Sequence, residues 1–211
     1  MRFLISFLAL ITILEAKLDP KPFYGSTQRI GRDTTLKYCE RKLFSDIYGI
    51  AMVKPRGTNS TLLVASDPNW CRLIYTSFNE SAQELKYLRQ FGGYGNAVGK
   101  FIYPMGICID TTVYQGNTNQ YAIYVTDSWN KRVAKEKYKI DKDSIVSDGI
   151  LVSGLSNPTD VACVSRPEGG AYIVVAEKDT HQIRLYQRSA TGVISFDSDL
   201  WNTGVWCWGV F

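Results

Sequence analysis

The chain has 211 residues, of which 45% are hydrophobic and 13% aromatic, and its formal net charge is +4. This length and composition are typical of one globular domain and exclude an intrinsically disordered protein. The positive charge is mild, and no long Lys/Arg block stands out. The sequence therefore carries no strong nucleic-acid signal, since a nucleic-acid surface normally shows a stronger basic bias.

Residues 1–16 have the pattern of a signal peptide. An apolar run from Phe3 to Leu14 follows Arg2, and it is too short to span a bilayer as a helix. Cleavage near Ala16 would remove one basic and one acidic residue and leave the charge at +4. We expect a secreted, extracellular protein with no transmembrane segment after signal removal; an uncleaved anchor is the alternative.

The next feature in chain order is a glycine-rich segment, "FGGYGNAVGKFIYPMGICID", over residues 91–110. Its glycine spacing fits neither the dinucleotide nor the phosphate-loop pattern, and Phe101 stands where a Ser or Thr would bind magnesium. The glycines also lead into a strand-like run rather than a helix. No nucleotide and no other cofactor is expected.

Three segments of the chain repeat one plan. Each has a first apolar strand, then a second one, then an Asp that precedes an Arg by five residues. The first strands are 48–53, 105–110 and 159–164, and the second strands are 61–66, 121–126 and 171–176. The Asp/Arg pairs are Asp67/Arg72, Asp127/Arg132 and Asp179/Arg184.

The Asp residues of the repeat are 60 and 52 residues apart, which suits a four-stranded meander. In that register, residues 80–91 should form an outer strand and its connection rather than a helix. An Asp and an Arg on either side of a turn can meet, so we interpret the pairs as structural ion pairs and not as catalytic groups.

The middle unit resembles an NHL repeat. It matches that pattern at Gly95, Gly99, Phe101, Pro104, Gly106, Asp110, Asp127, Asn130 and Arg132. The third unit keeps Pro158, Asp179 and Arg184, with Asp160 for the glycine and Gln182 for the Asn; the first keeps Gly49, Asp67 and Arg72, with Trp70 at the Asn position. The resemblance covers residues 48–196 and implies an all-β fold, a β-propeller of four-stranded blades.

The number of blades stays open at this point. Three units span residues 48–104, 105–158 and 159–205, and residues 206–211 resemble the start of another first strand. The chain is either a piece of a larger propeller, or residues 206–211 and the N-terminal segment 17–47 build a composite fourth blade. An open ring would favour self-association.

The turns between second and third strands, together with the connections into the first strands, form the usual binding face of a propeller. In this chain they carry large side chains with polar tips, which are good binding residues. The candidates are Asn69, Trp70, Tyr94, Lys100, Tyr103, Trp129, Lys131 and His181. The alternative is that each Trp only covers the neighbouring blade.

The cysteines and the single histidine bear on chemistry. The five cysteines have no CxxC pair, which argues against zinc; after export, one or two disulfides and one unpaired thiol are expected. His181 lies in a His-Gln-aliphatic context similar to a zinc-ligand histidine of the NHL-like peptidyl-hydroxyglycine lyase, but the further histidines of that enzyme are missing. No catalytic residue and no metal ligand is assigned. The cysteines are Cys39, Cys71, Cys108, Cys163 and Cys207.

The leading hypothesis is a non-enzymatic binding or scaffold module for a protein, peptide or glycan. A first alternative is a fragment of an extracellular propeller enzyme, a lyase or hydrolase, with its other catalytic residues outside this chain. A second alternative is an RNA-binding NHL propeller.

Overall fold

The computed structural model describes residues 45–202 of this chain, apart from residues 80, 82–83, 86–88, 113–115 and 167–168. The chain divides into two units, residues 1–43 and 44–211, and only the second is described below. No helix among the described residues is long and apolar enough to cross a membrane. The predicted signal peptide, nearly all of segment 17–47 and the strand expected at 206–211 lie outside the described residues.

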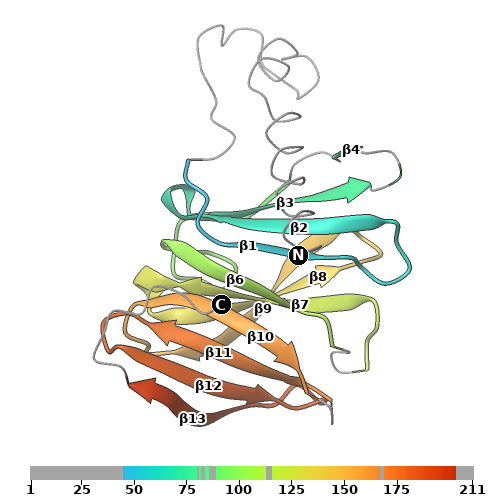
Figure 1. The fold of residues 1–211 in the computed structure, drawn as a ribbon. Helices are drawn as coiled ribbons and strands as arrows, with labels where there is room; N and C mark the ends of the chain where they lie inside the picture. The colour runs from blue at the N-terminus through green and yellow to red at the C-terminus, as the bar shows by residue number, and fades with distance from the viewer. Residues whose placement is uncertain are drawn as a thin grey trace, which may run out of the picture. The chain divides into compact units, whose positions relative to one another are not determined.

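The fold is all-β and β-propeller-like, with three antiparallel sheets that follow one another along the chain (Figure 1). Strands pair in sequence order, as in a meander, and no sheet closes on itself. The first sheet contains β1 (Ile50–Val53), β2 (Ser60–Asp67), β3 (Arg72–Asn79), β4 (Glu84–Leu85) and β5 (Arg89–Gly92). The second contains β6 (Pro104–Asp110), β7 (Gln120–Asp127), β8 (Arg132–Lys139) and β9 (Ser144–Ser153). The third contains β10 (Pro158–Ser165), β11 (Ala171–Glu177), β12 (Gln182–Arg188) and β13 (Ile194–Asn202).

The apolar runs of the sequence coincide with the first two strands of each sheet. The outer strand expected over residues 80–91 is present as two short strands, because β4 and β5 both pair with β3. All eight residues of β7 are buried. The second sheet is covered on both faces, which explains why its central strand reads as an almost continuous apolar run instead of an alternating one.

Two hydrophobic clusters join the sheets. One cluster combines side chains of the first and second sheets, including Leu73 and Ile123, and the other combines the second and third sheets, including Tyr124 and Ile173. Side chains alternate along a strand, so each strand of the second sheet contributes to both clusters. The second sheet is thus the shared layer of the described core.

Hydroxyl groups near the ends of second strands link each sheet to the next. Ser66 Oγ of β2 donates a hydrogen bond to the carbonyl of Met105 at 2.5 Å, and Thr126 Oγ1 of β7 donates to the carbonyl of Thr159 at 3.3 Å. The first strands also approach closely: a Cβ added at Gly106 would lie 2.5 Å from Cα of Asp160. Glycine at this position is therefore required by packing.

Candidate functional site

The three turns between second and third strands share one construction. Each begins where the second strand ends, at a fully buried acidic residue: Asp67, Asp127 and Glu177. Each closes on a non-glycine residue with left-handed backbone: Cys71 (φ 51°), Lys131 (φ 55°) and His181 (φ 55°). That conformation is uncommon for residues with a side chain, so its occurrence in all three turns shows that they share one backbone design. In the first two turns the intervening residues form the 3-10 helices η2 (Pro68–Trp70) and η3 (Ser128–Asn130).

Each buried carboxylate accepts a hydrogen bond from the segment that leads into its own sheet. The donor and acceptor pairs are Ser45 N with Asp67 (3.3 Å), Ile102 N with Asp127 (2.7 Å) and Ser156 N with Glu177 (2.5 Å). An arginine on the third strand completes each arrangement as an ion pair. The three pairs are Arg72 with Asp67 (3.1 Å), Arg132 with Asp127 (2.8 Å) and Arg184 with Glu177 (2.7 Å). The acidic residue therefore fixes the turn and the incoming segment at the same time.

In the third sheet, the predicted pairing of Asp179 with Arg184 is wrong. Arg184 instead forms its ion pairs with Glu177 and, at 3.5 Å, with Asp199. Asp179 is exposed in the turn, where it accepts a hydrogen bond from Asn157 Nδ2 at 3.0 Å. The reason is strand register. Glu177 lies opposite the first residue of its third strand, Gln182, just as Asp67 and Asp127 lie opposite the arginines that begin their third strands. Glu177, and not Asp179, therefore occupies the position of Asp67 and Asp127.

In the second sheet, this arrangement also orders the glycine-rich segment. Arg132 donates hydrogen bonds to the carbonyls of Asn96 (2.7 Å), Ala97 (3.2 Å) and Lys100 (2.7 Å). Asn130 Nδ2 donates to Asp127 Oδ2 at 2.7 Å and to the carbonyl of Gly95 at 3.0 Å. The glycines therefore let the backbone turn its carbonyls toward a guanidinium group, which gives them a structural role.

Competing effects act on the buried Asp127 carboxyl. Burial raises its pKa above the usual range, while hydrogen bonds from Asn130, the Ile102 amide and Arg132 act in the opposite direction. A group held by so many fixed donors is suited to organising backbone and is not placed to exchange protons with a ligand.

Exposed aromatic side chains gather around these turns. The indole of Trp129 is 69% exposed and stacks on the ring of Tyr103, with centroids 5.1 Å apart and planes inclined by 12°. Tyr94 and Trp70 are also exposed, and the guanidinium of Arg72 lies 4.1 Å from the Trp70 ring centroid. The stacked pair gives Trp129 a fixed orientation with one broad apolar face open to solvent.

Two residues that the sequence analysis did not select lie at the same place. Tyr48 is exposed, and the pKa of its hydroxyl is raised by partial burial and by the nearby Asp160 and Tyr103. Asp160 lies against Gly106, whose missing side chain leaves room for the carboxylate. The sequence signals were weak: Tyr48 directly precedes the first-strand glycine of its unit, and Asp160 replaces that glycine in the third.

We call this surface the aromatic rim. It comprises Tyr48, Trp70, Tyr94, Tyr103, Trp129 and Asp160, with the polar candidates Asn69, Lys100, Lys131 and His181 in or beside the same turns. Lys100 is exposed, and its Nζ donates to the carbonyl of Gly92 at 3.1 Å. Asn69 and Lys131 are exposed at the first and second turns, and His181 occupies the equivalent third turn. Among the described residues no three His, Cys, Asp or Glu side chains are grouped so that they could hold a metal ion.

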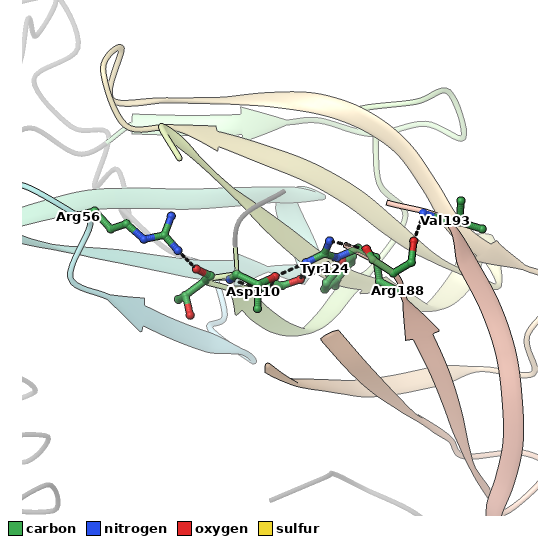
Figure 2. Close-up of polar contacts among 8 residues, drawn as sticks. Arg56, Asp110, Tyr124, Arg188 and Val193 are labelled. Carbon is green, nitrogen blue, oxygen red and sulfur yellow. Dashed lines mark hydrogen bonds and ion pairs between the residues drawn. The ribbon is translucent and has the colours of Figure 1, made fainter. Parts of the chain in front are cut away.

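A second polar cluster lies at the opposite ends of the strands. Arg188 of β12 and Asp110 of β6 form a fully buried ion pair at 2.6 Å, and the Tyr124 hydroxyl donates to the same carboxylate at 3.5 Å. Figure 2 shows that the contacts continue to Arg56, which donates to the carbonyl of Thr111. All three sheets contribute to this cluster, and its burial and complete pairing indicate a structural joint.

Comparisons with known proteins show the fold but no family. No protein-family model and no curated protein matches the sequence. An exo-β-1,3-galactanase from Phanerochaete chrysosporium, solved with β-1,3-galactotriose, is similar with a TM-score of 0.54 at 7% identity, over 72% of this chain and 37% of that chain. At this identity the similarity supports the β-propeller-like fold alone.

Two further structures are similar at lower scores. A putative exo-β-1,3-galactanase from Bifidobacterium bifidum s17 has a TM-score of 0.49 at 10% identity, over 81% of this chain and 55% of that chain. An exo-β-1,3-galactanase from Clostridium thermocellum has 0.46 at 12% identity, over 72% and 36%. This chain thus spans between about a third and about half of the length of these structures.

Proposed function

We propose that this chain is a secreted ligand-binding module built as consecutive NHL-type propeller blades, and that it takes an oligosaccharide on its aromatic rim. The observation that carries the proposal is the stacked pair of Tyr103 and Trp129, which holds an exposed indole face in a fixed orientation. An ordered aromatic side chain loses little conformational entropy when a ligand binds, so such residues contribute strongly to affinity.

The surroundings of Trp129 favour a sugar among the ligands considered. The face of a pyranose ring is apolar and its edge carries hydroxyl groups, so it needs a flat aromatic surface with hydrogen-bonding groups beside it. The rim offers Trp129 as the flat surface, the tyrosine hydroxyls of Tyr48 and Tyr103 as donors and acceptors, and the carboxylate of Asp160. The galactanase similar in fold was solved with β-1,3-galactotriose, which makes that trisaccharide a rational first probe.

The role of the motif residues supports the NHL type. Asp127, Asn130 and Arg132 are the residues through which the middle unit resembles an NHL repeat, and together they bind the glycine-rich segment of the same repeat. These three motif residues thus act through one set of contacts. Completing a ring takes at least one more blade than the three sheets described.

The binding proposal is tested with purified full-length protein on an oligosaccharide array that includes β-1,3-galactotriose, followed by calorimetry with each ligand that binds. Trp129→Ala should weaken binding at least tenfold, because it removes the flat surface. Val193→Ser is the matched control: its side chain is 67% exposed, but it lies in the β12–β13 turn at the other end of the strands. An array without any bound oligosaccharide, or equal losses in both variants, would contradict the proposal.

Secretion is tested separately. Expression in a secreting host should deliver protein to the medium with an N-terminus near Lys17, as read by Edman sequencing. Retention of residues 1–16 on membrane-bound protein would instead indicate an anchor.

A further inference from the structure

The first strands of the second and third sheets face each other through alternate residues. On β6, Gly106 approaches Asp160 of β10, and Asp110 pairs with Arg188 of β12. Residues two apart on a strand point to the same side, so the residue between them, Cys108, points toward the third sheet as well. Its packing against the second hydrophobic cluster agrees with this direction.

On β10, the same alternation of side chains places Cys163 opposite Cys108. Val161 belongs to the second cluster, and Cys163, two residues further on, packs against it. Both cysteines thus pack against the same cluster, and the Cys163 thiol is one of the neighbours that raise the pKa of the Cys108 thiol. Both carry free thiols in this structure. Two cysteines on facing strands of neighbouring sheets, with side chains that point into one interface, have the mutual orientation that a disulfide requires.

We propose that Cys108 and Cys163 are the site of a disulfide bond that joins the second and third sheets. The oxidant is a low-molecular-weight disulfide. One cysteine thiolate attacks it, releases one small thiol and forms a mixed disulfide. The second cysteine thiolate then attacks the protein sulfur of that mixed disulfide and releases the second small thiol. The protein has lost two protons and two electrons, and the small disulfide has become two thiols.

The surroundings of the pair affect the rate. Burial raises the pKa of the Cys108 thiol, and the neighbouring Asp110 and Asp160 carboxylates act in the same direction. Thiolate is therefore scarce at neutral pH, and exchange should accelerate as the pH rises. Cys71 is not a competing partner within the described residues, because it lies in the β2–β3 turn and packs against the first cluster.

Peptide mapping tests the bond directly. Full-length protein is equilibrated with oxidised glutathione at pH 8, quenched with acid, alkylated, digested and analysed by mass spectrometry. We expect a linked pair of peptides that contain Cys108 and Cys163, lighter by two hydrogen atoms than the sum of the free peptides and separated by reduction. Full alkylation of both cysteines, or a bond from either one to a different cysteine, overturns the proposal.

A thermal readout shows whether the bond joins the folded sheets. Closing a loop of about 55 residues should raise Tm by roughly 10 °C in a domain of this size. Oxidised wild type should show this shift relative to reduced protein, and Cys71→Ser should keep it. Cys108→Ser and Cys163→Ser should each lose it, so that the Tm of each variant is the same before and after treatment with the oxidant. A shift that persists in Cys108→Ser also overturns the proposal.

Discussion

Glu136 is a carboxylic acid with no exposed surface in the middle of β8. It lies between Ala134 and Tyr138 on the face that packs against the first hydrophobic cluster. Burial raises its pKa to about 8, while the nearby Ser147 hydroxyl, Asp148 amide and Arg132 charge act in the opposite direction. The group is therefore largely protonated in the folded protein at neutral pH, and ionised once the chain unfolds.

This difference predicts a pH dependence of stability with a definite sign. The folded-state pKa is above the unfolded value, so the contribution of Glu136 is fully present below pH 4.5 and is lost as the pH rises toward about 8. Over that range the free energy of unfolding should fall by roughly 3 to 5 kcal/mol relative to Glu136→Gln, whose side chain does not ionise. Urea unfolding at pH 5, 6.5 and 8 measures the difference. Parallel profiles for the two proteins would show that Glu136 does not titrate in this way.

The buried pair of Asp110 and Arg188 allows a second test at the residue scale. Asp110→Ala leaves the Arg188 guanidinium buried without its carboxylate and should cost about 3 to 5 kcal/mol of unfolding free energy. Asp110→Ala combined with Arg188→Met should recover part of that loss, because no charge remains uncompensated. The partly exposed pair of Arg89 and Asp143 provides the control, and Arg89→Ala should cost less than about 1 kcal/mol. Equal costs at the two sites in denaturant titrations would refute the structural role of the buried pair.

At the scale of elements, the β7–β8 turn and the glycine-rich segment behave as one unit in the structure. Arg132→Ala removes three hydrogen bonds to the carbonyls of that segment. We expect amides between residues 93 and 103 to exchange with deuterium at least tenfold faster. Local opening of the segment becomes easier because it no longer has to break these three hydrogen bonds. Arg184→Ala, with its contacts in the third sheet, is the control and should leave the segment unchanged. Unaltered exchange in Arg132→Ala would mean that the glycines order the segment by themselves.

Sequence reasoning locates the strands well and the contacts between them less well. The strands follow from apolar runs and turn residues, which are local properties. The third turn shows the limit: its acidic residue is Glu177, the last residue of the second strand as Asp67 and Asp127 are, but a search for Asp leads to Asp179 instead. A longer side chain does the same work there. Which acidic residue contacts the arginine depends on the register of the second strand against the third, and residue spacing in the sequence does not show that register.

The candidate site is likewise predictable from the sequence only in part. Trp70 and Trp129 are found from the sequence because both lie in turns that follow the second strand of a repeat unit. Tyr48 and Asp160 reach the rim only through the packing of one sheet against another, which single-sequence patterns do not contain. The disulfides expected from the cysteine count are absent among Cys71, Cys108 and Cys163, while Cys39 and Cys207 lie outside the described residues.

At the scale of the whole described unit, the two ends of the strands are built differently. One end carries the buried joint of Asp110 and Arg188, and the other carries the aromatic rim. A ligand that binds the rim can contact turns from more than one sheet, whose positions are fixed by the shared second sheet. The alternatives of an enzyme fragment or an RNA-binding propeller stay hypotheses, and salt-sensitive RNA retention would favour the latter.

The most direct measurement of the central claim is a titration of isotope-labelled protein with the strongest-binding oligosaccharide, followed by amide chemical shifts. We predict that the shifted amides cluster in residues 68–71, 93–103, 128–131 and 178–182, around the stacked Tyr103 and Trp129. Shifts confined to residues 140–143 and 189–193, in the turns at the opposite end of the strands, would contradict it.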